Sequence, residues 1–283
     1  MTDKTPVHPR RIDAHVHFWK LARGDYEWMT PDLTVLYRDY WPADLQPYLD
    51  ATGMQEIVIV QAAATVAETE FILDIARKTD FVSGVVGWVN LEDEAAPQTL
   101  GRLARNPYFK GIRPMIQDIA NVDWMLRESL TPGLRAVVEL DLAFDCLVKP
   151  PHLQNLHRLL AHHPDLRAVI DHGAKPQIAA GAYDQWAVDM KRLADDTAAL
   201  CKFSGLITEA GGGWTLEQLK PYADHLLRCF GPDRLIFGSD WPVVTLAGSY
   251  ETWFETANQL LRGLSAADKA KVFGENAARF YKL

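Results

Sequence analysis

Eight short apolar or β-branched runs recur along this chain of 283 residues, and no other feature constrains its fold as strongly. The runs cover residues 11–17, 57–62, 81–89, 110–115, 142–148, 167–172, 201–206 and 235–240. Stretches with helical spacing lie between them, for example residues 67–79, 151–164 and 186–200. Strands that are apolar on both faces and alternate with amphipathic helices predict a parallel sheet covered by helices.

The number and spacing of these runs favour a closed barrel over an open sheet. Their average interval, roughly 30 residues, corresponds to one βαβ unit per strand. One such barrel takes about 250 residues, and no linker rich in proline or serine divides this chain. We therefore predict an α/β protein with a single (β/α)8 TIM-barrel domain over residues 11–283, preceded by an N-terminal tail of residues 1–10.

The segment after the first predicted strand breaks the regular pattern. Residues 18–52 show no clear helix until about Pro42. The aromatic residues of this segment are Phe18, Trp19, Tyr26, Trp28, Tyr37, Tyr40 and Trp41. Long irregular loops in compact domains are usually functional or disordered, and so many aromatic residues argue against disorder. We expect an aromatic wall or lid over the barrel; a hydrophobic plug without substrate contact is the equal alternative for any one ring.

Composition narrows the functional class and the compartment. A net charge of −8 argues against broad nucleic-acid binding, which needs a basic face. No apolar run is long enough to span a membrane, and the polar N-terminus does not resemble a secretory signal. Three widely spaced cysteines without a CxxC pair are typical of reduced thiols. We predict a cytoplasmic enzyme that acts on a small molecule; its oligomeric state is open, with a homodimer as one option.

Two histidines close the first predicted strand. His15 and His17 are two residues apart, so in a strand they share a face and their Cα atoms lie roughly 6.5–7 Å apart. Both imidazoles can then reach one metal ion at about 2.1 Å. An HxH pair alone is a weak signal, but the C-terminal end of a barrel strand is where barrel enzymes place their chemistry.

Two more polar residues close later strands. His172 ends the sixth strand within VIDHGAKP, and Asp240 ends the eighth within IFGSDWP. Taken separately, His172 could be a hydrogen-bonded core histidine and Asp240 the N-cap of the next helix. Together with His15 and His17 they form a plausible nitrogen and oxygen site for one divalent ion, for which zinc is favoured and manganese or iron remain alternatives.

This set of residues resembles the amidohydrolase superfamily. The strings around it resemble the sugar-lactonase branch, which includes L-fuconolactonases and L-rhamnonolactonases, with pyrone-dicarboxylate lactonases as more distant relatives. They are RIDAHVHFW, YEW, DLQPYL, VIVQA, GVVGWVNLE, FKGIRPM, FDCLVKPPHLQNL, VIDHGAKP, LIFGSDWPV and NAARFYKL. The resemblance runs from about Arg11 to Leu283; its motifs are specific for the branch and separate substrates within it poorly.

The resemblance implies hydrolysis of a lactone C–O bond in carbohydrate metabolism. It implies that His15, His17, His172 and Asp240 are the metal ligands, and that His172 and Asp240 are catalytic. Asp240 would accept the proton of water and pass it to the leaving alkoxide, while a bound cation lowers the pKa of water toward about 7. The alternative is catalysis without the ion, by Asp240 as base and histidine and arginine donors at the carbonyl oxygen. The GIRPM string offers no bridging ligand, so we expect one metal ion rather than two.

Five residues are candidates for substrate binding. Arg113 could donate a fork of hydrogen bonds to a carboxylate or carbonyl oxygen, or be held in a buried ion pair, for instance with Asp145. The other candidates are Lys149, His152, Trp19 and Trp241. Lys149 and His152 could equally lie on a solvated loop. Trp19, Trp28, Trp88 and Trp241 could be platforms for a sugar ring or simply packing residues, and we favour Trp19 and Trp241 because they directly follow predicted site strands.

The few fixed positive charges predict a neutral, hydroxyl-rich substrate. We expect a fucono- or rhamnono-type 1,4- or 1,5-lactone, because a dicarboxylate should demand several arginines. An anionic lactone of the pyrone-dicarboxylate or muconolactone type remains an alternative. So do a metal-dependent decarboxylase of the same superfamily and a non-catalytic sugar-acid binding protein, although a binding protein has no need for a water-activating group.

Overall fold

The computed structural model describes residues 10–283, so the predicted N-terminal tail lies outside the described residues apart from Arg10. Eight strands form one parallel sheet in which each strand pairs with the next along the chain. They are β1 (Ile12–Val16), β2 (Glu56–Val60), β3 (Val82–Gly87), β4 (Phe109–Ile112), β5 (Ala143–Cys146), β6 (Ala168–Ile170), β7 (Leu200–Phe203) and β8 (Leu235–Phe237). Each strand overlaps one of the eight runs predicted from the sequence.

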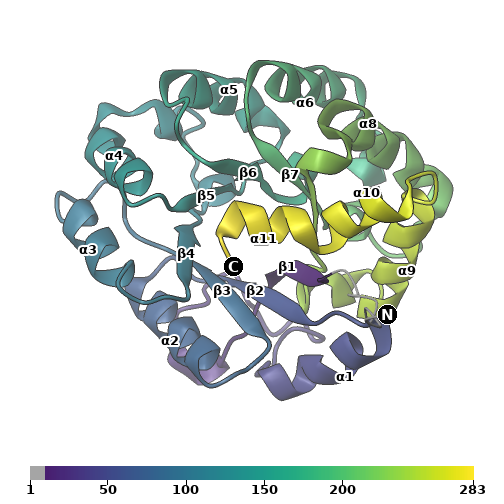
Figure 1. Cartoon of the computed structure of the whole chain (residues 1–283), viewed down its shortest axis with the longest axis horizontal. Coiled ribbons are helices and arrows are strands. Elements are labelled where there is room, and N and C mark those ends of the chain that lie inside the picture. The colour runs from purple at the N-terminus through teal and green to yellow at the C-terminus, as the bar shows by residue number, and fades with distance from the viewer. Residues whose placement is uncertain (1–9) are drawn as a thin grey trace, which may run out of the picture.

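The last strand returns to the first and completes the barrel. Just beyond β8, Trp241 forms a parallel bridge with Val16, and the amide of His17 donates to the Trp241 carbonyl at 2.7 Å. The amide of Asp240 donates to the His15 carbonyl at 2.9 Å. The predicted (β/α)8 barrel is confirmed, and the helices surround the strands (Figure 1).

Helices follow the strands and cover the outside of the barrel. They are α1 (Pro42–Thr52), α2 (Val66–Arg77), α3 (Ala96–Leu103), α4 (Thr131–Glu139), α5 (Leu153–His162), α6 (Asp184–Asp196), α7 (Leu206–Ala210), α8 (Leu216–Arg234), α9 (Tyr250–Leu260), α10 (Ala266–Ala270) and α11 (Asn276–Tyr281). Local sequence explains where several begin. The side chains of Thr65, Thr215, Ser249 and Ser265 each accept a hydrogen bond from the amide three residues later and so cap α2, α8, α9 and α10.

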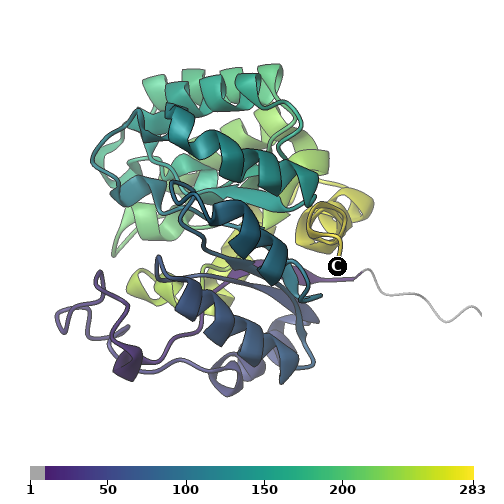
Figure 2. The ribbon, with the colours of Figure 1, turned by 90° about the vertical axis from the view of Figure 1, so that its left-hand side faces the viewer.

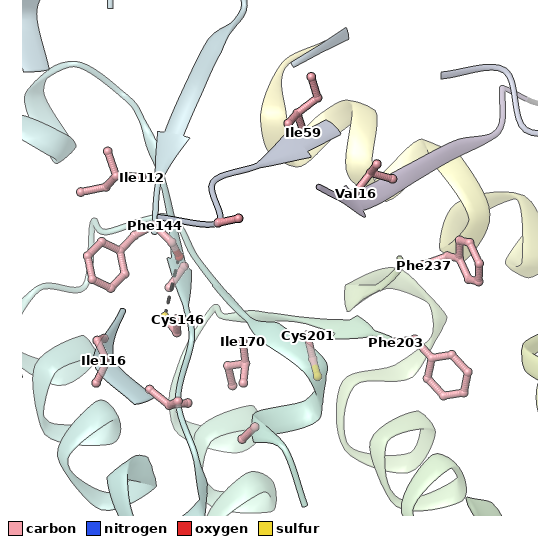
Figure 3. Close-up of a cluster of buried hydrophobic side chains, with 14 of the residues drawn as sticks. Val16, Ile59, Ile112, Ile116, Phe144, Cys146, Ile170, Cys201, Phe203 and Phe237 are labelled. Carbon is pink, nitrogen blue, oxygen red and sulfur yellow. Dashed lines mark hydrogen bonds between the residues drawn. The ribbon is translucent and has the colours of Figure 1, made fainter. Parts of the chain in front are cut away.

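Alternate strand residues pack into different apolar clusters. Ile59 belongs to the larger cluster, whereas its neighbours Val58 and Val60 belong to a smaller one that includes α11. Figure 3 shows part of the larger cluster, where side chains from different strands lie near one another. Strands that bury both faces need no polar face, which is why the eight runs are mostly apolar.

The two ends of the barrel are closed differently. Helix α11 lies across the barrel (Figure 1), and the carbonyls of residues 280, 282 and 283 accept hydrogen bonds from Arg167, Lys110 and Arg10, near the starts of β6, β4 and β1. The aromatic segment after β1 projects on the side away from the C-terminus (Figure 2). That side holds the C-terminal ends of the strands. Among the described residues, no helix is both long and apolar enough to cross a membrane.

Candidate active site

Three imidazoles face one carboxylate at the C-terminal end of the barrel. The Oδ1 atom of Asp240 lies 3.3 Å from His17 Nε2, 3.7 Å from His15 Nε2 and 3.8 Å from His172 Nε2. All four residues are buried. The structure therefore brings together the four side chains that the sequence places at the ends of β1, β6 and β8.

Two of the histidines are oriented through their other ring nitrogen. His17 Nδ1 lies 2.7 Å from the Val60 carbonyl oxygen, which can only accept, so Nδ1 carries the proton and Nε2 keeps its lone pair. His172 Nδ1 lies 2.8 Å from the hydroxyl oxygen of Ser204. Burial lowers the pKa of His17 and holds the pKa of His172 well below its usual range, although Asp240 raises both. Both rings are therefore neutral at pH 7.

His15 differs because positive groups face both of its ring nitrogens. Lys202 Nζ lies 3.0 Å from Nδ1, and an NH1 donor of Arg113 lies 3.3 Å from Nε2. Burial and then the Lys202 charge hold the pKa of His15 well below its usual range. A neutral ring has one lone pair, so it can accept from only one of these two donors at a time.

Lys202 anchors a fully buried network beneath His15. Its ammonium lies 2.5 Å from Asp145 Oδ2 and 3.1 Å from Asp171 Oδ1, and the hydroxyl of Tyr281 donates to Asp145 at 2.9 Å. Arg113 NH1 lies 3.6 Å from Asp171 Oδ2. Arg113 thus pairs with Asp171. The sequence suggested Asp145 as the partner of Arg113, but Asp145 pairs with Lys202 instead. Sequence reasoning missed this network, although a lysine flanked by two apolar residues inside a predicted strand was its signal.

Two site residues have a backbone conformation that residues other than glycine rarely adopt. His172 and Asp240 both have left-handed φ values, of 52° and 60°. Such conformations cost energy and persist only where surrounding contacts fix them. Gly205 packs so closely against His172 that an added Cβ would lie 2.8 Å from the ring Nδ1. These features aim the imidazole and the carboxylate at the same point.

The electrostatics keep Asp240 ionised. Burial raises the pKa of this carboxyl, but His172 and His17 outweigh burial, and the pKa lies below its ordinary value. Asp240 is therefore a carboxylate at neutral pH and can accept a proton or coordinate a cation.

A cavity of about 270 Å³ opens above these groups. Its lining consists of His17, Trp28, Leu33, Ala62, Arg113, Met115, Gln117, Asp118, Leu147, His172, Lys175, Thr208, Asp240, Val243 and Leu246. The site residues thus meet a space of the size that takes a small molecule and is reached from the C-terminal mouth of the barrel.

Of the five substrate-binding candidates, one lines the cavity and four do not. Arg113 lines the cavity. The ammonium of Lys149 donates to the Gln117 carbonyl at 3.2 Å, and the buried ring of His152 accepts from the Lys149 amide; neither residue belongs to the lining. Trp19 and Trp241 are almost fully buried and also lie outside the lining.

Within the aromatic segment, Trp28 is the ring that reaches the cavity. Its indole nitrogen donates to the Ala62 carbonyl at 2.8 Å, and 37% of its surface is exposed. Lys175 and Thr208, which the sequence did not single out, also line the cavity. Trp19 instead packs edge-on against Trp28 and Tyr40. The segment therefore forms part of the cavity wall through Trp28 and packs internally through Trp19.

The donor set fits a divalent cation. The ligand atoms of His15, His17 and Asp240 lie within 4.8 Å of one another, and those of His15, Asp171 and His172 form a second such group. A tetrahedral zinc site with bonds of about 2.1 Å has edges of about 3.4 Å, close to the Nε2–Oδ1 distances of His17 and His15. His172 does not fall in one group with His17, and the positive charges of Arg113 and Lys202 beside His15 oppose cation binding.

Known proteins resemble this chain over nearly its whole length. The profile of a family described as amidohydrolase matches residues 12–283. An L-fucono-1,5-lactonase of Burkholderia ambifaria is 46% identical over 277 residues, and one of Burkholderia multivorans is 36% identical over 295; each alignment covers 96% of both chains. The crystal structure of an amidohydrolase from Burkholderia multivorans with bound zinc has a TM-score of 0.92 at 34% identity and covers 97% of this chain and 99% of its own.

Proposed function

The chain belongs to the amidohydrolase family, and we propose that it hydrolyses a sugar-acid lactone of the fucono or rhamnono type, with Asp240 as general base. The protein is a carboxylic-ester hydrolase that acts on lactones. One observation carries the proposal: an ionised carboxylate faces three neutral imidazoles at the floor of the cavity. The 46% identity to an L-fucono-1,5-lactonase supports the same substrate class.

The residues of this chain account for the steps of ring opening. Asp240 accepts a proton from the attacking water as the new C–O bond forms at the ring carbonyl carbon. The donors of Arg113 stabilise the negative charge that develops on the carbonyl oxygen. Asp240 then returns its proton to the ring oxygen as the ring C–O bond breaks. The product is a hydroxy acid that ionises and releases one proton to solvent.

We propose one divalent ion, most simply zinc, held by His15, His17 and Asp240 with His172 beside them. Such an ion would polarise the carbonyl and acidify water. The fixed charges of Arg113 and Lys202 support the alternative in which side chains alone stabilise the transition state. Chelation separates the two mechanisms.

The charge of the cavity favours a neutral substrate. Its charged lining residues are Arg113, Lys175, Asp118 and Asp240, two of each sign. A dicarboxylate would meet two carboxylates and only two cations, one of which, Lys175, lies 3.8 Å from Glu209. A hydroxyl-rich neutral lactone needs no net positive charge, so it ranks above the pyrone-dicarboxylate and muconolactone types.

The test is a panel of sugar 1,4- and 1,5-lactones, with proton release followed by a pH indicator. A parallel assay measures CO2 release from aromatic carboxylic acids. Proton release without CO2 supports lactone hydrolysis, whereas CO2 release supports the decarboxylase. A protein that binds sugar acids but turns over no lactone would be the binding module instead.

The compartment and assembly stay proposals. The described residues contain three free cysteines, and Cys146 and Cys201 are buried, an arrangement compatible with the reducing cytoplasm. A homodimer remains an option that the size of the protein in solution would test.

A further inference from the structure

The cavity wall divides by chemistry around the ring of loops. Apart from His17 and Asp240 of the reacting centre, the lining residues from the adjacent loops after β8, β1 and β2 are Val243, Leu246, Trp28, Leu33 and Ala62. They are apolar except for the indole N–H of Trp28, which is already bonded to the Ala62 carbonyl. This arc suits the C–H groups of a ring.

The polar lining side chains above the reacting centre come from the loops after β4, β6 and β7. They are Gln117, Asp118, Lys175 and Thr208. Met115 and Leu147, from the loops after β4 and β5, also line this side, so one arc above the reacting centre is apolar and the opposite arc is mixed. That arrangement suits a ring that presents both C–H groups and hydroxyls.

Two members of the polar arc, Thr208 and Gln117, have a buried side-chain oxygen without a hydrogen-bond partner within residues 10–283. In Thr208 this atom is Oγ1, the only polar atom of the side chain. Helical threonines commonly bond the carbonyl four residues earlier, as Thr52 and Thr256 do in this chain at 2.7 Å. The hydroxyl of Thr208, in α7, makes no such bond. A buried hydroxyl without a partner costs about 1–3 kcal/mol, so an occupant of the cavity is expected to satisfy it.

We propose that Thr208 determines substrate specificity by hydrogen-bonding one ring hydroxyl of the lactone, while the arc from β8 to β2 packs against the C–H face. This inference rests on the proposed function, because it places the lactone in this cavity. Lys175 reinforces the polar arc. Its side chain lines the cavity, and Glu209 lies 3.8 Å from its ammonium.

The test compares Thr208→Val, Thr208→Ser and Thr208→Ala. Valine keeps the shape and removes the hydroxyl, whereas serine keeps the hydroxyl and removes the methyl. For the best sugar lactone of the panel, we expect valine and alanine to lower kcat/KM about three- to tenfold, chiefly through KM, because one neutral hydrogen bond is lost. Serine should stay near wild type. If valine impairs folding, the serine and alanine pair still isolates the hydroxyl.

Analogues of that lactone, each lacking one hydroxyl, identify the partner group. For the analogue that lacks the hydroxyl bound by Thr208, Thr208→Val should not lower kcat/KM further, because that hydrogen bond is already absent. A uniform loss across all analogues, or no loss with any, would overturn the inference. Thr256→Val is the matched control, since Thr256 lies on α9 outside the cavity lining and its substitution should leave KM unchanged. Failure of the wild type on every lactone would instead reject the proposed function.

Discussion

Asp240 meets two demands at once, because it must be ionised and yet lie in a site from which water is largely excluded. Burial by itself raises the pKa of Asp240 and so favours its protonated form. The pKa of Asp240 nonetheless lies below its ordinary value, with His172 and His17 as the main groups that lower it, and the left-handed backbone at residue 240 points the carboxylate at them. An isosteric amide there would keep the shape and lose the base.

Asp240→Asn is therefore expected to lower kcat by at least about 10² while KM changes little, because an amide cannot accept the proton of water. Steady-state kinetics on the preferred lactone measure both constants. Asp118→Asn is the comparison variant: Asp118 lines the same cavity away from the reacting centre, so any effect should appear in KM rather than in kcat. A fully active Asp240→Asn enzyme would remove Asp240 from the mechanism.

Glu68 is a second buried carboxyl, but its pKa is raised whereas that of Asp240 is lowered. It is fully buried in α2, and one of its oxygens accepts from the Ala62 amide while the other has no partner within the described part of the chain. Burial raises its pKa to about 8 from the ordinary value of 4.5. The folded protein thus keeps a proton that the unfolded chain has lost, and the free energy of unfolding falls as pH rises from about 4.5 to about 8.

Glu68→Gln should remove this contribution, since an uncharged amide can accept the same bond at any pH. Between pH 5 and pH 8 the wild type should lose stability relative to the variant, on the order of 1 kcal/mol per pH unit. Denaturant unfolding at both pH values measures the difference. Parallel behaviour of the two proteins would mean that Glu68 is ionised in the folded state.

Some site residues can be predicted from the sequence and others cannot. Four polar residues interrupt or end an apolar run, so strand period and barrel geometry predict that they lie together. They are His15, His17, His172 and Asp240. Lys202 is equally central, but in the sequence it is one lysine in a short run, and only closure of the barrel shows that its ammonium meets Asp145 and Asp171.

At the scale of elements, the sequence predicted the positions of the strands well and the contacts made by loop side chains poorly. The predicted start of a helix near Pro42 is correct. Trp19 and Trp241 follow site strands directly, yet their rings turn into the packing, and Trp28, further along the loop, lines the cavity. Loop side chains are oriented by long-range contacts such as the bond from Trp28 to Ala62, and sequence spacing carries no information about these.

Helix α11 supports the buried network beneath the site. Tyr281 reaches from it to the Asp145 carboxylate, whose pKa is raised to about 6 by burial. Tyr281→Phe should lower the free energy of unfolding by about 1–3 kcal/mol, because a buried carboxylate loses a donor. Tyr37→Phe, at a residue that is 44% exposed, should change it by less than about 0.5 kcal/mol. Equal denaturation midpoints for the two variants would show that α11 does not support the network.

At the scale of the whole molecule, ion binding and folding are linked. The proposed ligands lie in β1 or just after β1 and β8, with His172 just after β6, so the site exists only when the barrel is closed. An ion that binds only the folded state, at 100 times its Kd, stabilises that state by about 2.7 kcal/mol. In a chain of this size that is a rise in Tm of several degrees.

We therefore expect about one equivalent of zinc or a similar ion in the purified protein by elemental analysis, and a fall in Tm on chelation that zinc reverses. His17→Asn should abolish the response of Tm to zinc, whereas His162→Asn, at an exposed position on α5, should preserve it. Activity is measured on the same samples. A chelated protein with full activity would assign catalysis to Asp240, Arg113 and the imidazoles alone, while a Tm indifferent to zinc would mean that the charges of Lys202 and Arg113 beside His15 prevent the ion from binding.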